Sequence, residues 1–272
     1  MNKFKVREKQ TLKDFLATSL NISKSKAKSI IDSKSVLVNN KRVWIANHIL
    51  KSGDIVEIPS ALIKENRTLQ PDILYEDDYI IAVNKPPFIV SESHKSSVEE
   101  QLRKLKGKDI KAIHRLDKET SGVLLFAKDF SIFETFKKLW EEKRIKKIYY
   151  TVVHGRVNFN RTTIDFPVNG KKALSVVKTL KKNNLYSFLQ VDLKTGRKHQ
   201  IRIHMFKVGH PVVGDKEYGY KFINDPLEKS VSRHLLHAGK TEFVHPYTKR
   251  KVIINAPIFK DFKEFLRKAD LA

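Results

Sequence analysis

The sequence predicts an α+β protein with two domains: a small N-terminal α/β domain and a larger domain built on a mainly antiparallel mixed sheet. Hydrophobic residues on helical spacing are concentrated in residues 7–35. Beyond residue 70, strand-like segments do not alternate regularly with helices, which argues against a doubly wound parallel sheet. A segment without periodicity separates the two regions. We therefore expect a domain at residues 7–58, a linker at 59–70 and a second domain at 71–272.

Charge and composition narrow the class of protein. The chain has 272 residues, with 54 Lys and Arg against 30 Asp and Glu, and so a formal net charge of +24. Such a charge attracts polyanions, so nucleic acid is the first partner to consider, although lysine-rich surfaces also occur on proteins that bind none. The absence of cysteine excludes disulfides, thiolate nucleophiles and thiolate zinc sites. Without a long apolar run or a signal segment, we expect a cytoplasmic protein with no membrane contact.

The N-terminal domain is expected to begin with two helices. The first includes residues 11–16, whose hydrophobic side chains share one face. The second begins near Asn21 or Ser23, either of which can cap it, and runs through Ile31. The rest of the domain is expected to be β structure, with a hairpin at 36–38 and 43–45 around a turn at 39–41, and a last strand at 55–58.

This arrangement resembles the small alpha-L RNA-binding domain of a small-subunit ribosomal protein, on the basic second helix and the segments 36–43 and 50–58. The resemblance implies structured RNA as the partner. The positions that match its RNA face are Lys24, Lys26, Lys28, Lys41 and Arg42. Such residues contact phosphates and position the RNA without reading its sequence. For any one lysine, a solvated helix surface is the alternative interpretation.

The second domain is rich in strand-forming segments. Branched and aromatic residues predict strands at 73–75, 79–84, 123–127, 148–157, 174–180 and 186–193. Helices are expected at 98–105, 130–142, about 197–208 and 259–266. The hydrophobic stripe Phe130, Phe133, Phe136 and Trp140 has helical spacing, and we interpret it as core rather than as a platform for stacking bases.

A polar loop leads directly into one of these strands. It contains His114-Arg115-Leu116-Asp117 followed by Thr120-Ser121-Gly122. A loop anchored on a strand can hold a rigid site. From the chemistry of these residues alone, an ordinary loop in which Asp117 pairs with Arg115 or Lys118 is the more common explanation.

The same run resembles the signature of the RluA family of RNA pseudouridine synthases. Further blocks of that family follow in the expected order at 147–155, 193–204, 209–215, 236–238 and 245–246. The resemblance implies an enzyme that isomerises specific uridines in structured RNA by base flipping, without a cofactor. Large-subunit ribosomal RNA is the expected substrate and transfer RNA the alternative. We expect no bound metal, because the histidines lack the spacing of a zinc site. We also expect the protein to be a monomer.

The resemblance also implies roles for single residues. Isomerisation breaks the bond between nitrogen 1 and the sugar, turns the base over and joins the sugar to carbon 5, and a carboxylate must act beside the sugar and base. Asp117 matches the catalytic position, Tyr149 the tyrosine of the second block and Arg202 the basic position of the third. We expect Arg202 to keep Asp117 ionised. Tyr149 would stack on the base and assist loss of the carbon 5 proton, while Tyr150 points to the other side of the strand.

A uridine in folded RNA must leave its stack to reach a buried carboxylate. The resemblance implies that Arg115 fills the vacated space, where its flat cation can stack on bases. Residues 197–208 are expected to form one helix, on which Arg197 and Arg202 lie about 140° apart. The two side chains are therefore expected to point in different directions, and with the role that the resemblance implies for Arg202 we expect this residue to face Asp117 while Arg197 and Lys198 lie nearer the RNA. The remaining RNA contacts are expected at His114, Arg197 and Lys198.

One segment departs from the family pattern. Asn84-Lys85-Pro86 matches, but Pro87-Phe88 stands where small residues with a glycine are usual. Two other classes of protein are alternatives. A non-catalytic RNA-binding factor on the same fold would not need the full set of Asp117, Tyr149 and Arg202. A glycosidase would need a second carboxylate, which the sequence does not place.

Overall fold

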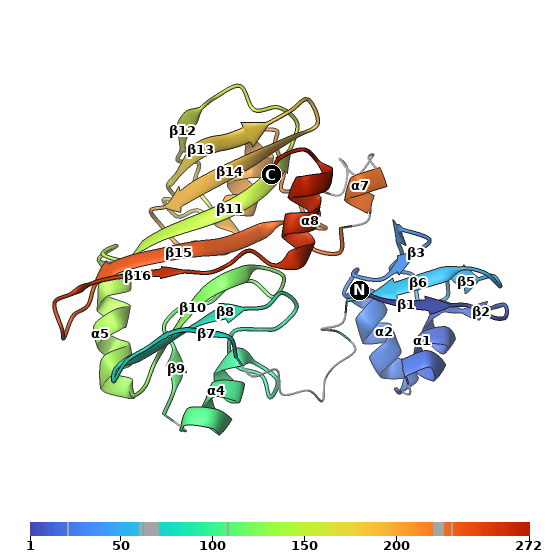
Figure 1. Ribbon diagram of the computed structural model, residues 1–272, viewed down its shortest axis with the longest axis horizontal. Helices are drawn as coiled ribbons and strands as arrows, with labels where there is room; N and C mark the ends of the chain where they lie inside the picture. Colours follow the sequence, from blue (N-terminus) through green and yellow to red (C-terminus); the bar gives the residue numbers. More distant parts are fainter. Residues whose placement is uncertain (21, 60–61, 63–70, 108, 220–225, 230) are drawn as a thin grey trace. The chain divides into compact units, whose positions relative to one another are not determined.

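A computed structural model describes residues 1–20, 22–59, 62, 71–107, 109–219, 226–229 and 231–272 (Figure 1). The chain divides into two compact units, Met1–Arg67 with Tyr220–Arg233, and Thr68–Gly219 with His234–Ala272. The predicted linker at 59–70 lies outside the described residues except for Pro59 and Leu62. Within the described part of the chain, no helix is long and apolar enough to cross a membrane.

The N-terminal unit packs two helices on a small sheet. The helices are α1 (Leu12–Leu20) and α2 (Lys24–Asp32). Ser23 caps α2, as predicted, by accepting a hydrogen bond from the backbone N–H of Lys26 (3.2 Å); Asn21 lies outside the described residues. The sheet has the order β1-β6-β3-β4, with strands at Asn2–Lys5, Ile55–Ile58, Leu37–Val38 and Lys41–Arg42. A separate pair joins β2 (Gln10–Thr11) to β5 (Ile49–Leu50).

The predicted hairpin in this unit is shorter than expected. Asn39 and Asn40 both have positive φ (49° and 63°), the conformation that a tight two-residue hairpin turn requires. The second strand then ends at Arg42, so the prediction of a strand at 43–45 is wrong. The chain turns away because the carbonyls of Ala46 and His48 accept hydrogen bonds from the start of α1.

The described residues of the second unit form one mixed sheet of ten strands. The order is β12-β13-β14-β11-β15-β10-β8-β7, with β16 paired to β15 and β9 to β10. The strands are β7 (Ile73–Glu76), β8 (Ile80–Lys85), β9 (Lys111–Ala112), β10 (Ser121–Ala127), β11 (Lys146–His154), β12 (Arg161–Ile164), β13 (Ser175–Lys182), β14 (Tyr186–Leu193), β15 (Leu236–Val244) and β16 (Lys251–Asn255). All pairs are antiparallel except β10 with β15. The predicted mainly antiparallel mixed sheet is thus confirmed.

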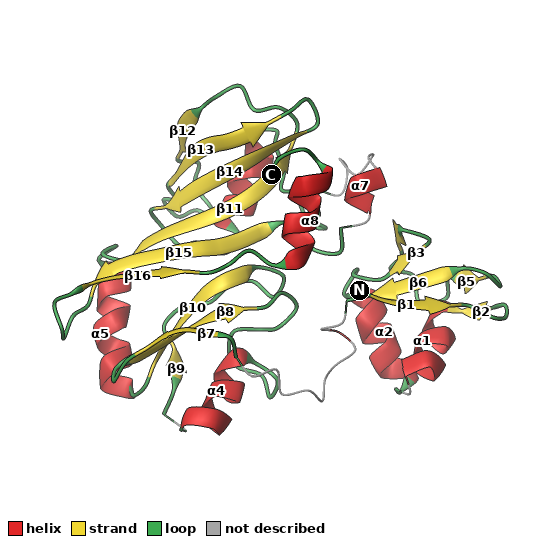
Figure 2. Cartoon of the chain, in the orientation of Figure 1, coloured by secondary structure: helices red, strands yellow, loops and turns green. Residues whose placement is uncertain are grey.

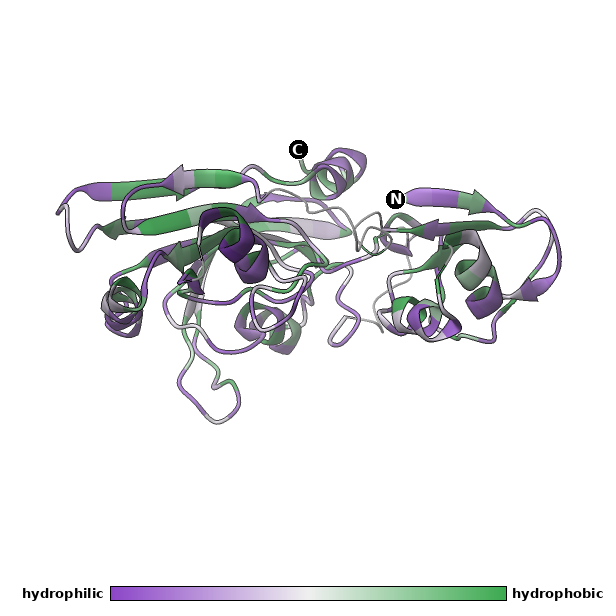
Figure 3. Cartoon of the chain, turned by 90° about the horizontal axis from the view of Figure 1, so that it is seen from below, coloured by the Kyte–Doolittle hydropathy of each residue, from purple (hydrophilic) through white to green (hydrophobic). Residues whose placement is uncertain are grey.

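Helices cover both faces of this sheet (Figure 2). They are α4 (Val98–Lys106), α5 (Phe130–Glu141), α6 (Gln200–Lys207) and α8 (Lys260–Lys268), while the short α7 (Pro226–Lys229) groups with the first unit. Side chains of β10 alternate between two buried clusters, as a strand with two covered faces requires. Leu124 and Phe126 join the cluster that includes α4 and α6, whereas Val123 and Leu125 join the one that includes α5. Figure 3 shows hydrophobic stretches along the strands and hydrophilic residues on the helices.

A glycine permits the parallel contact at the centre of the sheet. Gly122 pairs with Ala238 of β15 and has φ +114°. A Cβ atom at this position would lie 2.2 Å from the carbonyl oxygen of Ala238. Only glycine fits both the conformation and the space. This contact fixes the strand that immediately follows the polar loop of residues 114–120.

Two predictions about helices need correction. The third predicted helix begins at Gln200, because His199 adopts a left-handed conformation (φ 56°) that ends the preceding turn. Arg197 and Lys198 therefore precede the helix, and their expected angular relation to Arg202 does not apply. The aromatic stripe of α5 is only partly core, since Phe136 is fully buried but Phe130 is 63% exposed.

Candidate active site

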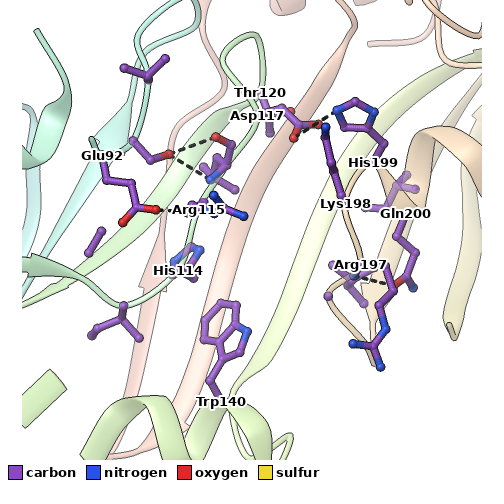
Figure 4. A pocket seen from close by; sticks show the side chains of 18 of the residues that line it. Glu92, His114, Arg115, Asp117, Thr120, Trp140, Arg197, Lys198, His199 and Gln200 are labelled. Atoms are coloured by element: carbon purple, nitrogen blue, oxygen red, sulfur yellow. Dashed lines mark hydrogen bonds and ion pairs between the residues drawn. The ribbon is translucent and has the colours of Figure 1, made fainter. Parts of the chain in front are cut away.

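The polar loop opens onto a cavity of about 640 Å³ in the second unit. Three segments of the chain line it, residues 90–93, 112–117 with Thr120, and 196–201, together with side chains of α5, β11, β14 and β15. Figure 4 shows the facing pair of Asp117 and His199 at one end and Trp140 at the other. Cavities of this size enclose ligands larger than one nucleobase.

Buried hydrogen bonds hold the loop that carries Asp117. The Ser91 hydroxyl donates to the carbonyl of Leu116 and accepts from its N–H, both at 3.0 Å. On the other side of Asp117, Thr120 lies 2.8 Å from Nε2 of His234. The next residue, Ser121, lies 2.9 Å from Nδ1 of His237. The carboxylate therefore stands on a loop that is fixed from both ends.

A buried lysine joins this loop to the segment that departs from the family pattern. The Nζ atom of Lys85 donates to the carbonyls of Pro86 (3.0 Å), Ile89 (2.8 Å) and Lys118 (3.2 Å). Phe88 has φ 71°, the left-handed region that favours glycine, which explains why a glycine would be usual nearby. Its N–H still donates to the carbonyl of Lys118 at 2.7 Å, so the contact between the two loops is retained.

Arg202 reaches the carboxylate of Asp117, but its strongest contacts are elsewhere. Nη1 of Arg202 lies 3.5 Å from Oδ2 of Asp117. Nε and Nη2 donate to the two oxygens of buried Asp215 at 2.6 and 2.8 Å, and Nη2 lies 3.1 Å from Glu217. Burial by itself would lower the pKa of Arg202. The hydrogen bonds and charge of Asp215, with a contribution from Asp117, outweigh burial, so the pKa of Arg202 lies above its ordinary value. The guanidinium is thus permanently charged and oriented.

His199 faces the other oxygen of Asp117. Its Nε2 lies 3.7 Å from Oδ1, and its Nδ1 lies 3.1 Å from the hydroxyl of Tyr218 and 3.4 Å from Glu217. Burial lowers the pKa of His199; Asp117 opposes this shift, while Arg202 adds to it. The sequence predicted no role for His199, Tyr218 or Glu217, although His199 lies inside the block at 193–204.

Tyr149 lines the same cavity from β11. It is buried, and burial together with the negative charge of Asp117 raises the pKa of its phenol, which therefore stays neutral. Its neighbour Tyr150 turns to the other side of the strand, where its ring contacts Phe188 and covers Gly239. This alternation agrees with the prediction.

The predicted RNA contacts around the cavity lie in different surroundings. Arg115 is exposed, and its Nε lies 3.6 Å from Glu92 rather than beside Asp117. His114 stacks on Trp140 (4.3 Å between ring centroids), and its Nε2 accepts a hydrogen bond from the N–H of Leu125. Burial lowers the pKa of His114 to about 3, with a further contribution from Lys147.

Arg197 and Lys198 line the cavity on the side of α6. Nε of Arg197 donates to the carbonyl of Lys172, and its own N–H donates to the side chain of Gln200 (both 3.1 Å). Arg197 and Arg202 therefore do point to different partners, although not for the helical reason that the sequence suggested. Lys198 directly precedes His199 at the cavity wall.

In the N-terminal unit, the predicted RNA-facing residues lie on α2 and β4. Lys24, Lys28 and Lys41 are exposed, and Lys26 and Arg42 are partly buried. Lys24 also pairs with Asp14 at 2.9 Å. Residues 1–58 carry 12 Lys and Arg against 5 Asp and Glu, so this unit is basic, as the net charge of the whole chain suggested.

Residues 79–207 match the family described as RNA pseudouridylate synthase, and residues 10–56 match the S4 domain. The chain is 32% identical to ribosomal large subunit pseudouridine synthase C of Vibrio cholerae, over 95% of this chain and 93% of that one. It is 30% identical to an uncharacterized RNA pseudouridine synthase of Bacillus subtilis, over 95% of this chain and 93% of that one. The chain belongs to the RNA pseudouridine synthase family.

Solved structures agree on the fold. The human RNA pseudouridylate synthase domain containing 1 superposes with a TM-score of 0.62 at 23% identity, covering 74% of this chain and 89% of that one. The human domain containing 4 superposes with a TM-score of 0.61 at 19% identity, over 73% and 92%. These structures confirm the predicted fold, and the family match and the relatives of 30% identity or more confirm the predicted enzyme class.

Proposed function

We propose that this enzyme isomerises uridines of large-subunit ribosomal RNA, and that Asp117 is its catalytic carboxylate. The observation that carries the proposal is the position of Asp117, which lines the cavity on a fixed loop with Arg202 at 3.5 Å. The substrate is inferred from the names of two relatives that are similar over nearly the whole chain, both ribosomal large subunit pseudouridine synthases.

Each group around the cavity then has a task. Asp117 acts beside the sugar and base while the bond to nitrogen 1 breaks and the bond to carbon 5 forms. Arg202 favours the ionised carboxylate. Tyr149 packs against the base as a neutral phenol, because burial and the charge of Asp117 raise the pKa of its hydroxyl. A phenolate is therefore disfavoured as the base, so the carboxylate of Asp117 accepts the proton that carbon 5 loses, while nitrogen 1 takes up a proton from solvent.

Arg115 is proposed to fill the gap left by the flipped uridine. Its side chain is 75% exposed at the edge of the cavity, and its ion pair with Glu92 is long at 3.6 Å. A pair this exposed costs little to break. The guanidinium is therefore available to stack on bases when RNA enters.

The substrate is tested in cells that lack the gene and carry either the wild-type protein or Asp117→Asn. Pseudouridines are mapped in all stable RNAs of both strains. Sites in large-subunit ribosomal RNA that appear only with the wild-type protein are expected. Sites that appear only in transfer RNA would move the substrate to the alternative class, and identical maps would refute a pseudouridine synthase role for Asp117.

A further inference from the structure

The two oxygens of Asp117 face two different side chains. Oδ2 lies 3.5 Å from Nη1 of Arg202, and Oδ1 lies 3.7 Å from Nε2 of His199. We propose that His199 is a positioning residue of the reaction, which donates its Nε2–H to Asp117 and fixes the rotation of the catalytic carboxylate. This inference rests on the proposed role of Asp117.

Arg202 alone cannot fix that rotation. Nε and Nη2 are taken by Asp215, and Nη2 also lies near Glu217, so only Nη1 is directed at Asp117. One long contact leaves a carboxylate free to turn about its χ2 angle, which is a soft torsion. A second donor on the opposite oxygen removes that freedom. In the described part of the chain, His199 is the side chain that the structure places there.

The imidazole is itself held in place. Its Nδ1 lies 3.1 Å from the hydroxyl of Tyr218, and the two rings meet edge to face at 5.9 Å. The hydroxyl of Tyr218 has two acceptors within reach, Nδ1 of His199 and the carboxylate of Glu217, which itself lies 3.4 Å from Nδ1. The proposal requires the tautomer in which the hydroxyl donates to Nδ1 and the proton of the neutral ring is on Nε2, where it points at Asp117. The ring of Tyr218 also lies 5.0 Å from the guanidinium carbon of Arg202. The same tyrosine therefore orients both donors of the carboxylate.

The charges around the ring agree with a neutral donor. Asp117 and Glu217 favour the protonated imidazole, while Arg202 and Lys198 oppose it, and burial lowers the pKa further. The lowered pKa favours the neutral ring, which carries a single proton. The distance to Asp117 is longer than a hydrogen bond, and such catalytic contacts commonly shorten when substrate closes the site.

The backbone supplies a design for the test. His199 has φ 56°, so any replacement pays a similar cost for the left-handed conformation unless it is Gly or Asn. His199→Gln and His199→Met are therefore a matched pair. They share an unbranched side chain of similar length and the same backbone cost, but only Gln carries an N–H that can reach the position of Nε2.

Single-turnover rates of tritium release from carbon-5-labelled RNA are measured for the wild type and both variants, with RNA affinity and the urea midpoint of unfolding for each. We expect His199→Met to be slower by on the order of 10²-fold, the effect of a misplaced reacting group. His199→Gln should recover most of that rate, and affinity should be equal in all three proteins.

Equal reduction of the rate in both variants would overturn the donor role of His199, and so would full activity in His199→Met. A reduction that followed the urea midpoint would assign the residue to folding instead. If the wild-type enzyme released no tritium, the proposed function itself would fail, so the two failures are distinguishable.

Discussion

Asp215 holds Arg202 through two buried hydrogen bonds of 2.6 and 2.8 Å, while Asp117 lies 3.5 Å from the same guanidinium. The arginine beside the proposed catalytic carboxylate is thus anchored by a different carboxylate. Burial would raise the pKa of Asp215, but the hydrogen bonds and charge of Arg202 lower it, so the pair stays ionised. Orientation of Arg202 toward Asp117 therefore depends on Asp215.

Asp215→Asn removes the charge that anchors Arg202. Removing one partner of a buried ion pair costs roughly 3 kcal/mol or more, and we expect the free energy of unfolding in urea to fall by about that amount. The rate of isomerisation should fall as well, because Arg202 is released. Glu264→Gln is the control, since it breaks an exposed pair with Lys260 worth less than about 1 kcal/mol. Equal effects of the two substitutions would contradict the anchoring role.

Gly122→Ala tests the close approach of β10 to β15. The added Cβ would lie 2.2 Å from a backbone oxygen of Ala238, so we expect destabilisation by more than about 4 kcal/mol or no folded protein. Gly107→Ala is a matched control, because Gly107 also has positive φ (+126°) but no atom within 4 Å of the added carbon. Its cost should be about 1–3 kcal/mol, from backbone strain alone. Similar thermal midpoints for the two variants would show that the clash is relieved.

The lowered pKa of His114, which stacks on Trp140, should make the protein less stable as the pH falls. Its pKa is about 3 in the folded protein and 6.5 as a free side chain, so the unfolded chain binds the proton first on acidification. Its contribution to stability is full above pH 6.5 and is lost progressively toward pH 3, with a slope of at most about 1.4 kcal/mol per pH unit.

His114→Gln retains an acceptor for the N–H of Leu125 but does not titrate. The free energy of unfolding of this variant should therefore fall less steeply between about pH 6.5 and 4 than that of the wild type. His94→Gln, in an exposed loop, is the control for removal of a histidine. Parallel curves of unfolding free energy against pH for His114→Gln and the wild type would show that folding does not lower the pKa of His114.

The lysines of α2 should set the salt dependence of RNA binding. Replacing Lys24, Lys26 and Lys28 with Ala should weaken RNA affinity and reduce the slope of log K against log salt by about 1 for each phosphate that the variant no longer neutralises. The same replacement of Lys260, Lys263 and Lys268 on α8 removes equal charge elsewhere and should change the slope less. Equal slopes in the two triple variants would mean that α2 has no special contact with RNA.

The sequence was most informative where local pattern and packing agree. Strand β14 has the predicted bounds of Tyr186–Leu193, because its branched and aromatic residues alternate between two sides. Ser23 caps α2 as a capping residue ahead of an apolar face should. The central strand β15 was missed, since Gly239, Lys240 and Glu242 interrupt its hydrophobic pattern. Pairing on both sides, not propensity, makes it a strand.

In the site, too, some residues could be predicted from the sequence, while others depend on tertiary contacts. Asp117, Tyr149 and Arg202 could be selected by resemblance, and the structure places all three around one cavity or in contact with a residue that lines it. The start of α6 could not be read, because the left-handed turn at His199 depends on tertiary contacts with Tyr218 and Glu217. Those partners lie beyond residue 214, and no local pattern connects them to the loop of Asp117.

The most direct test of the role of Asp117 is tritium release from carbon-5-labelled uridine in RNA by Asp117→Ala, measured with the wild type at matched RNA occupancy. We predict that the variant releases no tritium above background and binds the RNA with the affinity of the wild type. Release at the wild-type rate by Asp117→Ala would contradict the assignment of Asp117 as the catalytic residue.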